Sequence, residues 1–216
     1  MKFRALIIAV MASLLAGCAT AYYNTLDKAG VHKRDILVSR VEKTRDSQED
    51  AQDEFKDALE QFGSIVTLQD TDLKLAYDRL SSEYEDSQDA AQAVTDRINS
   101  VESVANALFR EWEGEIDQYT NADFKRSSTA QLRDTRTRYT GMLSTMRRSE
   151  ESMQPVLRTF RDNVLFLKHN LNAQAIGSLK GEFATLEDDI AVLIREMNKS
   201  ISESNKFSEE LRGASV

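Results

Sequence analysis

The sequence predicts an all-α protein, an elongated antiparallel four-helix bundle with coiled-coil-like packing. Apolar residues recur at alternating intervals of three and four along most of the chain after residue 31, which is the spacing of a narrow helical stripe that packs against other helices. The composition is also typical of helices, because charged residues make up 30% and the 216 residues include one proline. Short polar connections between the stripes make consecutive helices antiparallel.

Residues 1–17 are predicted to be a lipoprotein signal peptide that is not part of the fold. Lys2 and Arg4 form a basic start, and residues 5–15 form an apolar run of 11 residues, too short to span a bilayer. The residues before Cys18 (Leu-Ala-Gly) resemble the bacterial lipobox, in which the cysteine receives a diacylglyceryl group and becomes the first residue after cleavage. The alternative is an ordinary secretory signal with an incidental cysteine.

Residues 18–30 are interpreted as a lipidated tether. Cys18 is the only cysteine, so the chain can form no internal disulfide. Attachment of more than one acyl chain would anchor the protein without a transmembrane helix, which makes the membrane its first expected partner. The residue after the cysteine is Ala19 and not an aspartate. By resemblance to the sorting rule of many Gram-negative lipoproteins, this favours the outer membrane, facing the periplasm, if the cell is Gram-negative.

The helical bundle is expected over residues 31–211, with helices at about 31–69, 71–119, 122–170 and 173–211. The first helix has the weakest stripe, because a polar stretch follows Val41 and ends only near Phe55. The second has the clearest stripe, running from residue 73 to residue 119 with few polar interruptions.

The last two helices carry local features with structural consequences. Thr120 and Asp123 resemble a capping box that opens the third helix. Pro155 lies inside that helix, where the loss of one backbone hydrogen bond predicts a bend. Gly177 and Gly181 lie one turn apart on the fourth helix and indicate either a close helix approach or loosely held surface.

Charge predicts which helices pair. Residues 70–119 contain 13 acidic and four basic side chains, whereas residues 122–171 contain five acidic and 10 basic ones. Neighbouring antiparallel helices of opposite sign favour each other and disfavour wrong partners. Exposed ion pairs contribute only about 0 to 1 kcal/mol each, so charge selects the pairing more than it stabilises it.

The hairpin formed by the second and third helices should overhang the bundle at the end where the chain starts, because these two helices are the longest. Aromatic and basic residues near its tip are candidates for contact with a membrane or a partner. The alternative is that Trp112 and Tyr119 belong to the apolar stripe and only pack the two helices together. The candidate contact residues are Trp112, Tyr119, Phe124, Lys125 and Arg126.

Two further binding surfaces are considered. The third helix has a basic face that either grips an anionic envelope polymer or pairs with the acidic helices; it comprises Arg133, Arg136, Arg147, Arg148, Arg158 and Arg161. Small or polar stripe positions would leave room for an apolar or lipid ligand between the helices, which is the alternative function; these are Ser87, Ala91, Thr135 and Ser149.

The sequence favours neither catalysis nor a cofactor. A di-metal bundle needs a Glu-x-x-His pair on each of two helices, but the two histidines, His32 and His169, lack such a glutamate and are expected at opposite ends of the bundle. We therefore expect no metal, no cofactor and no enzyme. The net charge of −8 opposes nucleic-acid binding.

Four stretches resemble a bacterial family catalogued as a domain of unknown function. They are KAGVHKRDILVSRVEK (28–43), DALEQF (57–62), LFREWEGEIDQY (108–119) and RTFRDNVLFLKHNLNAQAIGSL (158–179). The resemblance covers about residues 26–205 and implies an all-helical, coiled-coil protein of Proteobacteria from a family whose members often carry a lipobox, with no catalytic residues to carry over. We expect a lipid-anchored envelope protein with a structural or interaction role, whose partner is another envelope protein or a second copy of itself.

Overall fold

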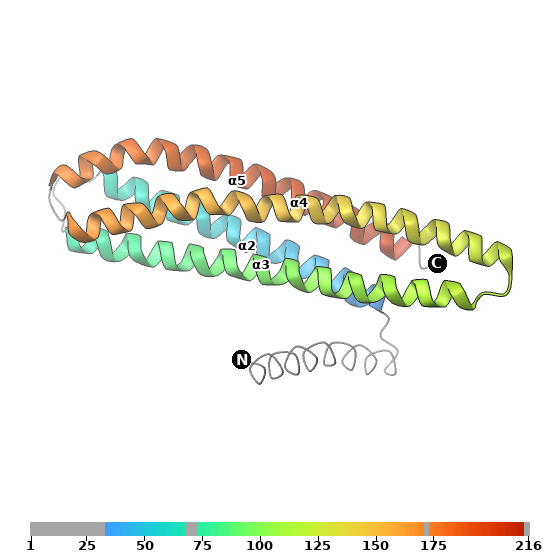
Figure 1. Ribbon diagram of the computed structural model, residues 1–216. Helices are drawn as coiled ribbons and strands as arrows, with labels where there is room; N and C mark the ends of the chain where they lie inside the picture. The colour runs from blue at the N-terminus through green and yellow to red at the C-terminus, as the bar shows by residue number, and fades with distance from the viewer. Residues whose placement is uncertain (1–32, 68–72, 171–172, 214–216) are drawn as a thin grey trace, which may run out of the picture.

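The computed structural model describes residues 33–67, 73–170 and 173–213, and these residues form four long helices arranged side by side (Figure 1). The helices are α2 (Lys33–Thr67), α3 (Leu73–Gln118), α4 (Ala122–His169) and α5 (Ala173–Gly213). The predicted fold class is confirmed: the described residues are an elongated helical bundle. The predicted signal peptide, Cys18 and the predicted tether lie outside the described residues.

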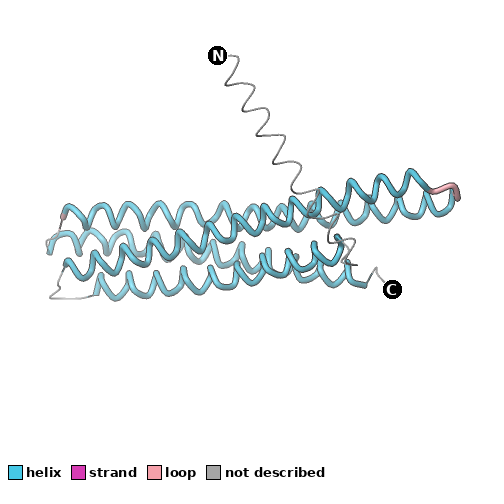
Figure 2. The backbone as a smooth tube through the Cα atoms, turned by 90° about the horizontal axis from the view of Figure 1, so that it is seen from below, coloured by secondary structure: helices cyan, strands magenta, loops and turns pink. Residues whose placement is uncertain are grey.

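Consecutive helices run antiparallel, and each helix packs against two others. The contacts join α2 to α3, α3 to α4, α4 to α5 and α5 back to α2, so the chain winds once around the bundle. Seen from a second direction, the α3–α4 hairpin projects beyond the ends of α2 and α5 (Figure 2). Because α3 and α4 have 46 and 48 residues, each helix spans roughly 70 Å at 1.5 Å per residue.

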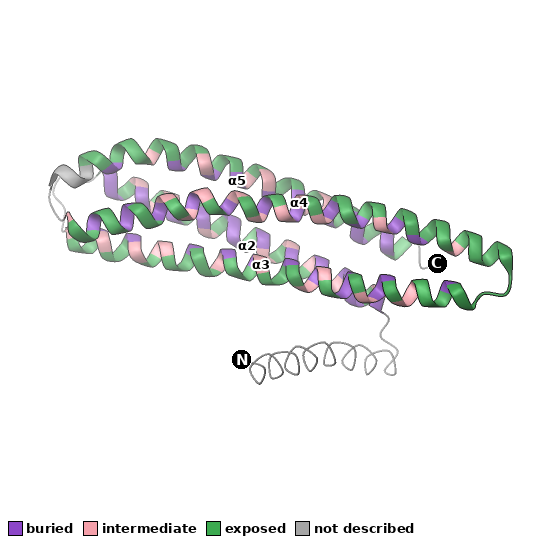
Figure 3. Cartoon of the chain, in the orientation of Figure 1, coloured by how far each residue is buried: buried purple, intermediate pink, exposed green. Residues whose placement is uncertain are grey.

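The core is a line of buried side chains along the bundle axis, with exposed residues on the outer faces (Figure 3). Each helix contributes residues spaced by three and four, because that spacing returns to the same face of the helix. The largest fully buried side chains are those of Phe55, Phe62, Phe160, Leu37, Ile65, Leu80, Ile98, Met142, Met146, Met153, Leu167 and Leu179.

Three phenylalanine rings form a packed aromatic cluster near the end of the bundle opposite the overhang. Phe62 lies edge-on to Phe160, with 6.2 Å between ring centroids, and it stacks on Phe183 at 5.8 Å. A Cβ atom at Gly63 would lie 3.2 Å from the Phe183 ring, so this glycine lets α5 approach α2 closely. By contrast, a Cβ at Gly177 or Gly181 would meet nothing within 4 Å, which supports the loose-surface interpretation of those two glycines.

A buried polar layer crosses the middle of the bundle. Gln48 of α2 is fully buried, and its Nε2 donates to Ser149 Oγ of α4 at 2.6 Å and to Ser200 Oγ of α5 at 3.1 Å. The Gln48 Oε1 atom is buried without a hydrogen-bond partner. Within residues 42–50 of the polar stretch that weakened the expected stripe of the first helix, Thr44 and Gln48 are interior, while the remaining residues are exposed or half-buried. Such a layer fixes the alignment of helices, because only one register pairs its polar groups.

Helix α4 starts at a cap one residue away from the expected one. The Asn121 side chain accepts hydrogen bonds from the backbone N–H groups of Asp123 at 2.8 Å and Phe124 at 3.2 Å. Asparagine is among the best N-cap residues because its side chain satisfies amide groups that the first turn leaves unpaired. The predicted Thr120 cap is therefore wrong. At Pro155 the helix continues without interruption.

The predicted pairing of acidic α3 with basic α4 is visible in the ion pairs that join them. Arg147 of α4 pairs with Glu102 of α3 and also donates to Asn99 Oδ1 at 2.8 Å. Arg136 pairs with Glu113 at 2.6 Å, and its guanidinium lies 5.1 Å from the centre of the Phe109 ring. These contacts combine charge with ring packing and hold the two longest helices together.

On the other seam of α3, where it packs against α2, the two helices place carboxylates near one another. Burial and the neighbouring carboxylates of Asp86 and Asp57 raise the pKa of Glu54. Burial, followed by the charge of Glu54, raises the pKa of Glu83. Since a raised folded-state pKa favours the protonated form, this seam is less stable at neutral pH than in acid.

Replacing Glu83 with glutamine is therefore expected to stabilise the protein by roughly 0.5 kcal/mol at pH 7. The gain should vanish below the unfolded pKa of about 4.5, where the carboxyl group is protonated in both states. Urea denaturation of the wild type and the variant at pH 7 and pH 4 measures this difference. Glu85→Gln, at an exposed position of the same helix, is the control and should change little at either pH.

Candidate interaction site at the hairpin tip

The overhanging hairpin is the part of α3 and α4 between residues 113 and 131, including the turn that joins them. Lys33, the first described residue of α2, pairs with Glu111 through Nζ and Oε1 at 2.8 Å. On the other side, Glu210 near the end of α5 pairs with Arg138 at 3.3 Å. The α3–α4 hairpin continues past these two contacts and projects beyond the ends of α2 and α5, so the expected overhang is present (Figures 1 and 2).

Towards the overhang the buried face of α3 changes. Apart from Leu73, Tyr77 and Tyr84, which are partly exposed, the predicted stripe is buried as far as Leu108. Beyond Leu108, Phe109 and Ile116 are buried instead of Trp112 and Tyr119. The reason is geometric: α2 begins at Lys33, beside Glu111, and nearer the tip only the residues of α3 that face α4 remain covered. Phe109 packs edge-on against Tyr139 of α4, with ring centroids 5.3 Å apart. Burial raises the pKa of Tyr139 to about 12, so this phenol is neutral at physiological pH.

Trp112 is half-buried and held by polar contacts. Its Nε1 donates to Ser128 Oγ of α4 at 2.8 Å. The Arg34 guanidinium of α2 lies 5.5 Å from the centre of the indole, within the range of a cation–π contact. Trp112 therefore links the start of α2 to both helices of the overhang, in agreement with the packing alternative for this residue.

Tyr119 and Phe124 differ from Trp112 because they are exposed at the end of the molecule. Tyr119 is 44% exposed and Phe124 is 63% exposed. Their rings contact each other edge-to-face, with centroids 6.4 Å apart. The structure thus divides the candidate residues into a packed tryptophan and an exposed aromatic pair.

The two basic candidates at the tip are both ion-paired. Lys125 Nζ lies 3.2 Å from Asp117 Oδ1 and bridges α4 to α3. Arg126 pairs with Asp123 one turn earlier on its own helix. All four side chains are exposed, so these pairs contribute little to stability. They do neutralise the local positive charge.

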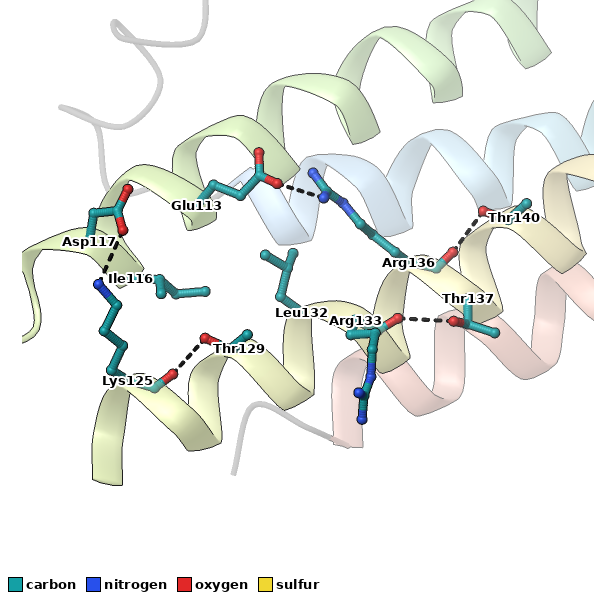
Figure 4. A pocket seen from close by; sticks show the side chains of 10 residues that line it. All are labelled: Glu113, Ile116, Asp117, Lys125, Thr129, Leu132, Arg133, Arg136, Thr137 and Thr140. Atoms are coloured by element: carbon teal, nitrogen blue, oxygen red, sulfur yellow. Dashed lines mark hydrogen bonds and ion pairs between the residues drawn. The ribbon is translucent and has the colours of Figure 1, made fainter. Parts of the chain in front are cut away.

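An open groove of about 960 Å³ runs along one face of the overhang (Figure 4). Ile116 and Leu132 point into it, and the Glu113–Arg136 and Asp117–Lys125 ion pairs cross from helix to helix on either side of them. Three threonines on α4 also line the groove, and each of them (Thr129, Thr137 and Thr140) donates to a carbonyl of its own helix. The groove is amphipathic, and its lining carries both acidic and basic side chains. Such a mixture of charges does not favour an anionic ligand.

A second groove of about 720 Å³ lies on the other face of the hairpin, where α2 begins. Its lining combines the first turn of α2 with Trp112, Tyr119 and Ser128. Of the positions suggested for an interior ligand, Ser87 and Ser149 are fully buried, and Ser149 is bonded to Gln48. Thr135 lines a cleft of about 10 Å³, which is close to the space of one water molecule.

Most of the predicted basic face of α4 is paired within the protein. Arg136 and Arg147 bond to acids of α3, and Arg161 bonds to Asp162 at 3.1 Å. Arg133 lies 3.9 Å from Asp134, while Arg148 and Arg158 are exposed. These contacts favour the pairing interpretation over a continuous anion-binding face.

The described residues contain no group of three or more His, Cys, Asp or Glu side chains placed to hold a metal ion. His169 is the exposed last residue of α4, and His32 lies outside the described residues. In the described ranges, no helix combines the length and apolar character that a membrane span requires.

Fold and site together define an elongated antiparallel four-helix bundle that ends in an overhanging hairpin with an exposed aromatic tip. The chain belongs to the family described as protein of unknown function (DUF2959), whose model matches residues 22–211. The resemblance to a bacterial domain of unknown function is thus confirmed. Neither the curated proteins nor the solved structures include a match to this chain.

Proposed function

We propose that this protein is a lipid-anchored component of the bacterial cell envelope with a structural or protein-interaction role and no catalytic activity. The observation that carries the proposal is the N-terminal pattern: a basic start, an apolar run and then Leu-Ala-Gly before Cys18. The outer membrane, facing the periplasm, is the proposed location, and the proposed partner is an envelope protein or a second copy of the chain.

The shape of the described residues suits a spacer or scaffold. A rod of roughly 70 Å carries a packed core, while its open grooves lie on the surface rather than in the interior. The first described residue, Lys33, lies beside Glu111 at the base of the overhang. A lipid placed a short distance before Lys33 would therefore hold the rod by the end that carries the overhanging hairpin.

The anchor is tested by replacing Cys18 with serine. We expect the wild-type chain to incorporate labelled palmitate and to sediment with membranes, and the Cys18→Ser chain to lose the label and most of its membrane association. The basis is that two or more acyl chains hold a protein on a bilayer stably, whereas no described helix could replace them. Ala19→Ser leaves the cysteine in place and is the matched control. Equal labelling of the wild type and Cys18→Ser would disprove the anchor.

The alternative function, a periplasmic module that holds an apolar or lipid ligand between its helices, gives a different result. Native mass spectrometry of the protein purified from cells would then show a co-purifying mass that disappears after organic extraction. The buried, hydrogen-bonded state of Ser149 favours the structural role.

A further inference from the structure

We propose that the tip of the overhanging hairpin is a second membrane contact, at which Tyr119 and Phe124 enter the headgroup interface of the bilayer that holds the lipid on Cys18. This inference rests on the proposed lipid anchor and adds a defined surface and orientation to it. The occupant of the tip is a lipid surface rather than a protein groove, for three reasons: the form of the aromatic pair, the charge around it and the position of the chain start.

The aromatic pair projects from the end of the rod. Phe124 and Tyr119 flank the turn between α3 and α4, and 63% and 44% of their surfaces are exposed. The rings contact each other edge-to-face rather than by stacking, and both remain exposed. Aromatic side chains are enriched at the membrane–water interface, where an apolar ring and a polar group such as the tyrosine hydroxyl are both accommodated.

The charge around the pair indicates which lipids matter. Asp117 and Asp123 neutralise Lys125 and Arg126, Glu113 is paired with Arg136, and Glu115 of the overhang adds negative charge. The tip therefore has no positive excess that would attract anionic lipids. Insertion of the rings into the interface is the remaining attraction, so the contact should form on zwitterionic bilayers and should depend little on salt.

The chain length before α2 allows the lipid and the tip to reach the same plane. Lys33 pairs with Glu111, and the helix from Glu111 to Gln118 rises only roughly 10 Å. About 15 residues separate Cys18 from Lys33, and a segment of that length spans roughly 50 Å when extended and roughly 22 Å even when coiled as a helix. Either length exceeds the overhang, so an anchored lipid permits the tip to touch the bilayer.

The tether also makes a weak contact effective. Two aromatic rings give a soluble protein little affinity for a bilayer. Once the lipid holds the chain, binding of the tip becomes intramolecular, and its effective concentration at the surface rises to about the millimolar range. The two contacts together would hold the rod away from the surface, with Leu165 and Phe166 of α4 at the far end.

The experiment uses one tryptophan as a depth probe. Trp112 is the only tryptophan, so Phe124→Trp in a Trp112→Phe background reports on the tip alone. The full lipidated chain is reconstituted in phosphatidylcholine–phosphatidylethanolamine vesicles with and without lipids that carry a nitroxide near the headgroup. Phe166→Trp in the same background is the matched control, because Phe166 is a 38% exposed phenylalanine near the opposite end of the same helix. Tyr119→Trp in that background provides a second probe of the tip, and circular dichroism checks that each variant is folded.

We expect the nitroxide lipids to lower the Phe124→Trp and Tyr119→Trp fluorescence by roughly twofold or more, with little effect on Phe166→Trp, because only the tip lies at the interface. If the Phe166→Trp probe is quenched as strongly as the two tip probes, the tip contact is overturned and the anchor stays intact. The same holds if the protein floats with the vesicles but the tip probes are not quenched. Failure of the lipid-bearing wild type to float overturns the anchor itself. Quenching that requires anionic lipid and disappears at high salt overturns the aromatic contact in favour of an electrostatic one.

Discussion

Replacing Phe62 with alanine should lower the free energy of unfolding by about 3 to 5 kcal/mol, the usual loss when a buried phenylalanine is truncated. Phe62 is fully buried and contacts Phe160 edge-on and Phe183 face-to-face. The variant would lose the burial of one ring and both ring–ring contacts, and it would leave a cavity where α2, α4 and α5 meet. Rigid helices cannot close such a gap without displacing other core side chains.

Urea denaturation followed by circular dichroism at the helical band, on a chain that begins at Ala19, measures this loss. Phe124→Ala is the matched control, because it removes the same ring from an exposed position and should cost less than roughly 0.5 kcal/mol. If Phe62→Ala proved no more costly than Phe124→Ala, the aromatic cluster would not be part of the stabilising core.

The four helices could be predicted because the buried residues of a bundle helix recur every three or four positions, and this spacing is visible in the sequence. Leu80, Val94 and Ile98 recur at intervals that return to one helix face, and each of them is buried in the structure. Where the ends lie in described residues, the helices begin and end within about two residues of the expected positions. The pairing of α3 with α4 was equally visible in their opposite charges.

The tip could be predicted only in part, because a periodic stripe does not reveal where a neighbouring helix stops. Leu108, Trp112 and Tyr119 lie on one stripe of α3. Leu108 is buried, Trp112 is half-buried beside Arg34 of α2, and Tyr119 is exposed. Towards the tip, the residues that face α4 are buried instead: Phe109, which packs on Tyr139, and Ile116. The exposure of Tyr119 is therefore a consequence of the unequal helix lengths and not of its own spacing.

The interior contacts between distant helices were the least predictable. The sequence offered Gly177 and Gly181 as sites of close approach, but the close approach occurs at Gly63 against Phe183. A pair of glycines one helical turn apart can be recognised in the sequence. Which side chain of a neighbouring helix lies against a single glycine, in contrast, depends on how the two helices are aligned. The same holds for Gln48, whose partners Ser149 and Ser200 lie more than 100 residues away along the chain.

Replacing Gln48 with glutamate should destabilise the bundle by about 3 to 4 kcal/mol at pH 7, because an ionised carboxylate would be buried without a cation. The wild-type amide donates to two serine oxygens, and Ser149 Oγ already donates its own proton to the Met146 carbonyl at 2.7 Å. A carboxylate at this position would therefore face an acceptor unless Ser149 gave up that hydrogen bond.

The pH dependence of this variant has a definite sign. Burial should raise the pKa of the new carboxyl group in the folded state above its unfolded value of about 4.3. Below that value both states are protonated, and the neutral acid can donate to a serine as the amide does, so the deficit should largely vanish near pH 4. As the pH rises between the two pKa values, the deficit should grow by about 1.4 kcal/mol per unit.

The matched control separates burial of charge from loss of the polar layer. Gln48→Met keeps the side-chain length, removes the unpaired Oε1 atom and introduces no ionisable group, so its stability should stay within about 1 kcal/mol of the wild type at both pH values. If Gln48→Glu instead matched Gln48→Met at pH 7, the carboxylate would have to be hydrated. The seam between α2 and α5 would then admit water at the centre of the rod, and the hydrogen bonds of Gln48 could not be what fixes the register of the helices.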